Sequence, residues 1–177
     1  GLDFPLEGLP ILGGLDPGEL MVVARQIEHK VNSPLTSSAG RLFDAVSALA
    51  GVCGVVDYDA QAAIELEMLA DEKATGGYPF SLAEEDGCRV VKLGALVATV
   101  IDDVKQGMPA SAVSTKFHRT MAGMIVDICR AISGDTGIKV AALSGGVFQN
   151  RLLFRLAVNG LREQGFEVLT HRLVPCN

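Results

Sequence analysis

The sequence predicts an α/β chain in which a helical block is followed by a short β-α-β segment. Between residues 16 and 133 the apolar side chains recur every three to four positions, which is the period of amphipathic helices. Residues 138–143 instead form a short apolar run of the kind seen in buried parallel strands, and a second strand pattern occupies 167–172. Two strands cannot bury both faces of a sheet, so further strands are expected from elsewhere.

The helical block is predicted to begin with a helix from Asp16 to about residue 30. Asp16 is a suitable N-cap, and Pro17 fits the first helical position. A second helix follows a cap within 36–38 and extends to about residue 49.

A third helix is predicted over residues 57–74 and is ended by Gly76-Gly77. Asp57 and Asp59 would lie at its start, where the helix dipole favours acidic side chains. Glu65 and Glu67 are assigned to its solvated face. A polar turn at 84–86 and a strand over 89–92 are expected next.

Two more helices complete the block, one from about 96 to 107 and a long one from Pro109 to about 133. His118 lies beside the apolar stripe of the long helix, where a lone histidine is more often a core residue than a ligand. The final segment is predicted as strand 138–143, helix 147–161 and strand 167–172.

The strand–helix junction is the first candidate binding site. Gly145 and Gly146 follow the strand, and glycines there let a phosphate or sugar approach the main chain. The free N–H groups at the helix start would face such a ligand, and Asn150, one turn into the helix, could reach the same mouth. The alternative is a plain strand-to-helix turn.

The start of the second helix is the other candidate site. Gly40 in its first turn costs about 1 kcal/mol relative to alanine, which suggests that the space is needed. Asp44 lies on the same face, and a carboxylate there suits the hydroxyls of a ribose. Alternatively, Gly40 allows a close helix crossing and Asp44 pairs with Arg41.

Composition excludes several function classes. The net charge of −6 without a basic stripe argues against nucleic-acid binding, and no apolar run could span a membrane. Four widely spaced cysteines and no secretory signal predict free thiols and a cytoplasmic location. The three histidines are scattered, so no metal site can be assigned within this chain.

The motifs resemble the C-terminal part of the HypF family, the carbamoyltransferases that mature nickel–iron hydrogenases. The resemblance spans nearly the whole chain, with motifs in the family's order. The matching segments are NSPLTSSAGRLFDAV (32–46), QAAIELE (61–67), FHR (117–119), LSGGVFQNR (143–151) and GFEV (165–168).

The resemblance implies a fragment of a Kae1-like (TsaD-like) domain with the actin/Hsp70/sugar-kinase fold, which is ribonuclease-H-like. Residues 1–137 would form its helical insertion, and 138–177 an incomplete β-α-β part of the second lobe. In that family, carbamoyl phosphate and ATP give carbamoyl-adenylate. The carbamoyl group then passes to the C-terminal cysteine of HypE and becomes the cyanide ligand of the hydrogenase iron.

The resemblance also implies roles for single residues. Gly40 and Asp44 would contact the ribose of the adenylate, and Gly145, Gly146 and Asn150 would hold the nucleotide. No catalytic residue can be assigned, and the roles of His118 and Arg41 stay open. The family's divalent metal (zinc, iron or magnesium) would be held by ligands outside this chain, so the fragment alone is expected to be inactive.

Two other functions fit the same sequence. One is a kinase or threonylcarbamoyl-type transferase of the same fold, although Arg41 stands where those relatives have glutamate. The other is a non-catalytic interaction module, which would expose a large apolar patch and bind no nucleotide.

Overall fold

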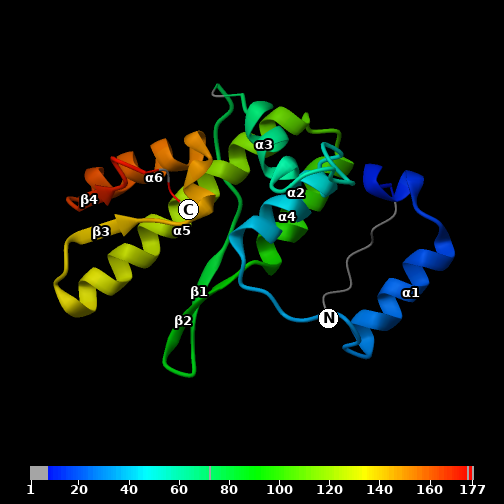
Figure 1. Cartoon of the computed structure of the whole chain (residues 1–177), viewed down its shortest axis with the longest axis horizontal. Helices are drawn as coiled ribbons and strands as arrows, with labels where there is room; N and C mark the ends of the chain where they lie inside the picture. The colour runs from blue at the N-terminus through cyan, green and yellow to red at the C-terminus, as the bar shows by residue number, and fades with distance from the viewer. Residues whose placement is uncertain (1–7, 72, 175, 177) are drawn as a thin grey trace.

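The long helix α5 (Ala110–Thr136) runs through the body of the structure, and the other parts of the core are arranged along it (Figure 1). The structure, a computed structural model, describes residues 8–71, 73–174 and 176. Pro109 precedes α5, and Gly137 ends it in a left-handed conformation with φ 73°. The long helix predicted from the three-to-four spacing is therefore confirmed.

Three helices pack on the first half of α5 and form the main core with it. They are α2 (Ala39–Leu49), α3 (Gln61–Met68) and α4 (Gly94–Lys105). α2 and α4 agree with the predicted helices. Their apolar faces meet α5 in one cluster, whose fully buried members include Phe43, Val46, Leu66, Leu96 and Phe117.

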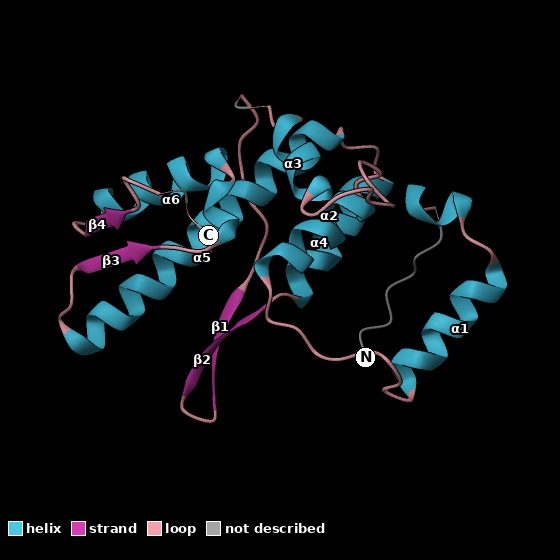
Figure 2. Ribbon diagram, in the orientation of Figure 1, coloured by secondary structure: helices cyan, strands magenta, loops and turns pink. Residues whose placement is uncertain are grey.

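The β-α-β segment lies on the second half of α5, as Figure 2 shows. β3 (Val140–Leu143) pairs in parallel with β4 (Glu167–Thr170), and α6 (Arg151–Glu163) joins them. The predicted β-α-β order is confirmed. The hydrophobic core is continuous across residue 137, and the division into 1–137 and 138–177 stays a prediction.

Only one face of this small sheet is covered within the described chain. Ala141 and Leu143 are buried, whereas Val140 and Leu169 are 48% and 49% exposed. A parallel sheet is normally covered on both faces. The expectation that further strands come from elsewhere stays a prediction.

Helix α1 (Pro17–Glu28) forms as predicted but contributes nothing to the core. Asp16 accepts hydrogen bonds from the N–H groups of Gly18 and Glu19 at 2.7 and 3.2 Å, so it is the N-cap. No residue of α1 is buried, and the helix stands apart from the body, joined to it through the short 3-10 helix η1 (Pro10–Gly14). No helix in the described part of the chain is long and apolar enough to cross a membrane.

The predicted helix over 57–74 is wrong at both ends. α3 starts after Ala60, which has a left-handed conformation (φ 64°) and makes no side-chain cap. Asp57 donates its N–H to the side chain of Gln61 at 2.7 Å, so the two aspartates are not the caps. α3 does not continue beyond Met68. The backbone carbonyl of Asp71 instead accepts a hydrogen bond from the Thr115 hydroxyl of α5 at 2.9 Å.

The β-hairpin that lies between α3 and α4 was not predicted from the sequence. β1 (Ser81–Glu85) pairs antiparallel with β2 (Cys88–Lys92), whereas only the second strand was predicted. Asp86 and Gly87 form the connection, with φ of 51° and 75°. Asp-Gly with two positive φ angles is typical of a two-residue hairpin turn, so this dipeptide was the signal for the missing strand.

Candidate functional site

A cleft of about 700 Å³ lies between the starts of α2 and α3 and the loop that follows β3. It brings together three residues from the two candidate sites, Gly40 from one and Gly146 and Asn150 from the other. Asp44 and Gly145 do not line it. The remaining lining residues are Ser38, Ala39, Phe43, Asp59, Ala60, Ala63, Ile64, Glu67, Val147 and Gln149.

Gly40 borders open space in the cleft. Ser38 caps α2 by accepting the N–H of Arg41 at 3.5 Å. A Cβ built on Gly40 would meet only the Ser38 hydroxyl oxygen at 3.5 Å, which is ordinary contact. Gly40 therefore does not serve a close helix crossing, and the space beside it belongs to the cleft.

Asp44 lies one turn further along α2 and pairs with Arg41. The carboxylate oxygen is 2.8 Å from the guanidinium, and the Asp44 side chain is 26% exposed. This is the pairing that the alternative reading of the sequence predicted. The ribose contact of Asp44 stays a prediction.

The double glycine leads into a 3-10 turn instead of the α-helix predicted from residue 147. Gly145 has φ 100° and ψ 155°, and η2 (Gly146–Gln149) follows it. Phe148 donates its N–H to the Gly145 carbonyl at 3.1 Å, and Asn150 donates to Val147 at 3.2 Å. Helix α6 therefore begins only at residue 151, and its first N–H groups lie beyond the glycines.

The first turn of α6 is capped from within the chain. Leu153 donates its N–H to the Asn150 side-chain oxygen at 2.8 Å. Leu152 donates its N–H to a carboxylate oxygen of Glu67 at 3.0 Å. The N–H groups of Leu152 and Leu153 are therefore not free for a ligand, and Asn150 is the N-cap, not a residue one turn inside the helix.

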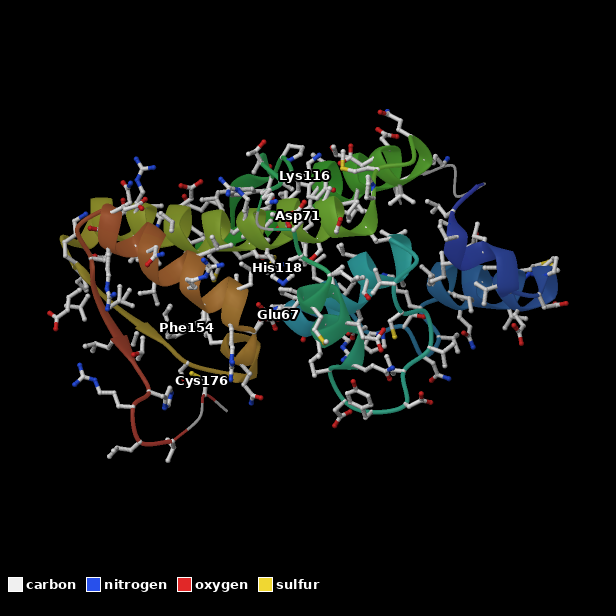
Figure 3. The ribbon with its side chains drawn as sticks, turned by 90° about the horizontal axis from the view of Figure 1, so that it is seen from above. Glu67, Asp71, Lys116, His118, Phe154 and Cys176 are labelled. Carbon is white, nitrogen blue, oxygen red and sulfur yellow. The ribbon has the colours of Figure 1, made fainter. Side chains whose placement is uncertain are left out.

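Glu67 is the site residue that sequence reasoning misplaced. It was assigned to the solvated face of α3, but it is half-buried, lines the cleft and stabilises the start of α6. Figure 3 shows it beside His118 where α3, α5 and α6 meet. Its position four residues after Ala63, which also lines the cleft, is a helical spacing that could have revealed a shared face.

His118 is fully buried on α5, as its place beside the apolar stripe predicted, and it contacts a site residue. Its Nδ1 is 2.8 Å from the carbonyl oxygen of Ser114, and its Nε2 is 2.9 Å from the side-chain nitrogen of Asn150. Burial lowers the pKa of His118 below its ordinary value, against smaller opposing effects of Ser114 and Glu67.

The other histidines do not join this site. His171 follows β4, and its Nε2 is 2.9 Å from the Ser144 hydroxyl oxygen, while His29 caps the end of α1. Among residues 8–71, 73–174 and 176 no cluster of histidine, cysteine and acidic side chains could hold a metal ion. The expectation of metal ligands outside this chain stays a prediction.

Replacing Gly145 with alanine is expected to lower the free energy of unfolding by about 1–3 kcal/mol, because its φ and ψ lie in a region that only glycine adopts without strain. Gly146→Ala is the matched control, since its φ is not in the left-handed region and no atom lies within 4 Å of a built Cβ. Urea unfolding of both variants measures the difference. Equal losses would show that backbone strain is not the cause.

The chain matches known proteins over almost its whole length. The family described as "Carbamoyltransferase, Kae1-like Domain, second subdomain" matches residues 11–177. Carbamoyltransferase HypF of Synechocystis sp. is 32% identical over 154 residues, which cover 86% of this chain and 19% of the relative. Carbamoyltransferase HypF of Rhizobium leguminosarum bv. viciae is 36% identical over 148 residues, covering 82% and 18%. The chain thus spans about a fifth of the length of these relatives.

Solved structures agree with these matches. A crystal structure described as full-length HypF in the phosphate- and nucleotide-bound form superposes with a TM-score of 0.90 at 37% identity, over 97% of this chain and 27% of that one. T. kodakarensis HypF gives a TM-score of 0.71 at 23% identity, over 89% and 20%, which supports the fold alone.

Proposed function

The chain belongs to the Kae1-like domain family of the HypF carbamoyltransferases, and from this premise we propose that its cleft holds the adenylate from which a carbamoyl group is transferred. The resemblance and the Kae1-like α/β fold class predicted from the motifs are confirmed. The reaction, its substrates and its partner belong to the proposal, because the chain is a small part of its relatives.

The cleft carries this proposal, because it joins two motifs that lie more than one hundred positions apart in the sequence. Its volume of about 700 Å³ falls within the range of small-molecule sites. Gly40 and Gly146 leave main chain open to it. The N–H groups of Gly146 and Val147 have no hydrogen-bond partner among the described residues, so they are available to a phosphate.

The substrate is carbamoyl-adenylate, made from carbamoyl phosphate and ATP, and the acceptor is the C-terminal cysteine of HypE. The thiol sulfur bonds to the carbamoyl carbon while the carbon–oxygen bond to the adenylate phosphate breaks. AMP leaves with the bonding electrons, and the thiol proton passes to solvent. The resulting thiocarboxamide is the precursor of the hydrogenase cyanide ligand.

This chain supplies binding and orientation to that reaction. A divalent metal would stabilise charge on the phosphate, but the described residues contain no cluster that fits a metal, and no step is assigned to one here. We therefore expect the chain alone to catalyse no transfer, and measurable carbamoyl transfer by it would contradict this. A cytoplasmic location, consistent with four free cysteines, is part of the same proposal.

Replacing Gly40 with leucine is expected to weaken binding of ATP with Mg²⁺ by about tenfold or more, because the side chain would enter the cleft. The fold should tolerate the change, since leucine favours a helix over glycine by up to about 1 kcal/mol. Ala45→Leu, on an exposed position of the same helix, is the matched control and should bind normally.

Isothermal titration of the chain and both variants provides this measurement. Equal affinities of the Gly40 and Ala45 variants would place the nucleotide outside the cleft. Absence of any binding by the unmodified chain would instead favour the interaction module.

A further inference from the structure

The buried position of His118 determines how the Asn150 amide is oriented at the cleft. The imidazole shows no surface to solvent, and the rings of Phe43 and Phe117 pack edge-on against it at centroid distances of 5.3 and 6.2 Å. Ser114 lies one turn before it on α5. The imidazole is therefore shielded from bulk solvent, and its two nitrogens depend on their protein partners.

The geometry assigns the tautomer of His118. Nδ1 is 2.8 Å from the Ser114 carbonyl oxygen, which can only accept, so Nδ1 carries the proton. In the neutral imidazole Nε2 then has a lone pair and must accept. Its partner at 2.9 Å is the side-chain nitrogen of Asn150, which can only donate.

The same orientation of Asn150 follows independently from α6. The amide oxygen accepts the N–H of Leu153 at 2.8 Å, which requires the oxygen, not the nitrogen, on the helix side. The amide is thus fixed from two sides. One N–H and one oxygen lone pair remain for the cleft that Asn150 lines.

We propose that His118 is a positioning residue for the cleft, holding the Asn150 amide in the one orientation that offers a defined donor and acceptor to a bound nucleotide. This inference rests on the proposed nucleotide site. His118 contacts no ligand itself and acts through Asn150. If the Asn150 amide rotated freely, it would present either its N–H group or its oxygen to the nucleotide. Part of the binding free energy would then be lost to ordering the amide.

Protonation of His118 would break this arrangement. Nε2–H would then face the amide nitrogen, two donors would meet, and the amide would have to turn over. Its nitrogen would next face the N–H of Leu153, so α6 would lose its cap. Of the groups facing the imidazole, Glu67 from α3 is the charged one, while Phe43, Ser114 and Asn150 are neutral.

Three substitutions separate positioning from packing. His118→Leu fills similar space in the core but removes the acceptor at Nε2. It should weaken binding of ATP with Mg²⁺ by about tenfold, which corresponds to about 1.4 kcal/mol. His118→Gln offers an amide oxygen near the position of Nε2 and should restore affinity to within about threefold of the unmodified chain. Asn150→Asp keeps an oxygen that caps α6 but cannot donate to Nε2, and it should weaken binding like His118→Leu.

Nitrogen NMR of the labelled chain provides a readout that needs no ligand. The expected result is a neutral His118 with the proton on Nδ1, and one Asn150 amide proton coupled to Nε2. A proton on Nε2 would overturn the inference, and so would equal nucleotide affinity of His118→Leu. If the unmodified chain binds no ATP, the proposed function fails, while the tautomer and the amide coupling still decide how Asn150 is held.

Discussion

Replacement of Lys116 with methionine is expected to lower the free energy of unfolding by about 3–5 kcal/mol. The Lys116 ammonium pairs with the carboxylate of Asp103 between α5 and α4, and the two side chains are only 17% and 13% exposed. It also lies 4.5 Å from the centroid of the Tyr78 ring. Methionine would fill similar space but leave the Asp103 carboxylate largely buried without its partner.

Urea unfolding of three variants tests the cause of this loss. Lys92→Met is the matched control, because the ion pair of Lys92 with Glu85 on the hairpin is about half exposed and should contribute less than about 1 kcal/mol. The double variant Lys116→Met/Asp103→Leu should recover most of the loss, since no charge is then left buried. A double variant as unstable as Lys116→Met would contradict this account.

The stability of the chain is expected to rise with pH across the range in which His118 titrates. Burial lowers the pKa of His118 in the folded state, so the unfolded state, with a pKa near 6.5, binds the proton more readily. This contribution to stability is fully present above about pH 6.5. It is lost at about 1.4 kcal/mol per pH unit as the pH falls from there toward the folded pKa.

Unfolding free energies measured across this range for the unmodified chain and His118→Gln isolate the effect. Acidic side chains contribute similarly to both proteins, so the difference in slope reports His118. The variant should show the shallower dependence on pH. Equal slopes would show that His118 binds its proton as readily in the folded state as in the unfolded one.

Elements that depend on local pattern were predictable from the sequence. The long α5 has a stripe of apolar residues at helical spacing, and burial of that stripe fixes both the helix and its orientation. Asp16 starts α1 and Gly137 ends α5, both as predicted, because capping uses only neighbouring backbone groups.

Elements that depend on distant contacts were not predictable. α3 ends early because the Asp71 carbonyl bonds to the hydroxyl of Thr115 on α5, which is more than forty residues away in the sequence. Glutamate is usually a surface residue, so the sequence favours an exposed Glu67. Its carboxylate lies in the site because it accepts the N–H of Leu152, which is 85 positions away in the sequence. The hairpin had a local signal in Asp86-Gly87, and the polar residues around it outweighed that signal.

The candidate site was predicted in part. Family motifs identified Gly40, Gly146 and Asn150, which the fold places around one cleft. Spacing alone could not do so, because the cleft forms only when the fold brings the starts of α2 and α3 together with η2. Spacing also placed Asn150 inside a helix, whereas the 3-10 turn makes it the cap of α6 and the partner of His118.

The separation of α1 from the core has a consequence for hydrogen exchange. A helix of twelve residues is marginal in water unless its apolar face is packed, and no residue of α1 is buried. Its amide protons therefore exchange through local opening, at a rate that denaturant hardly changes. Those around Phe117, in the middle of the core, are expected to exchange only when the core itself unfolds, so α1 and the core should open as two separate cooperative units.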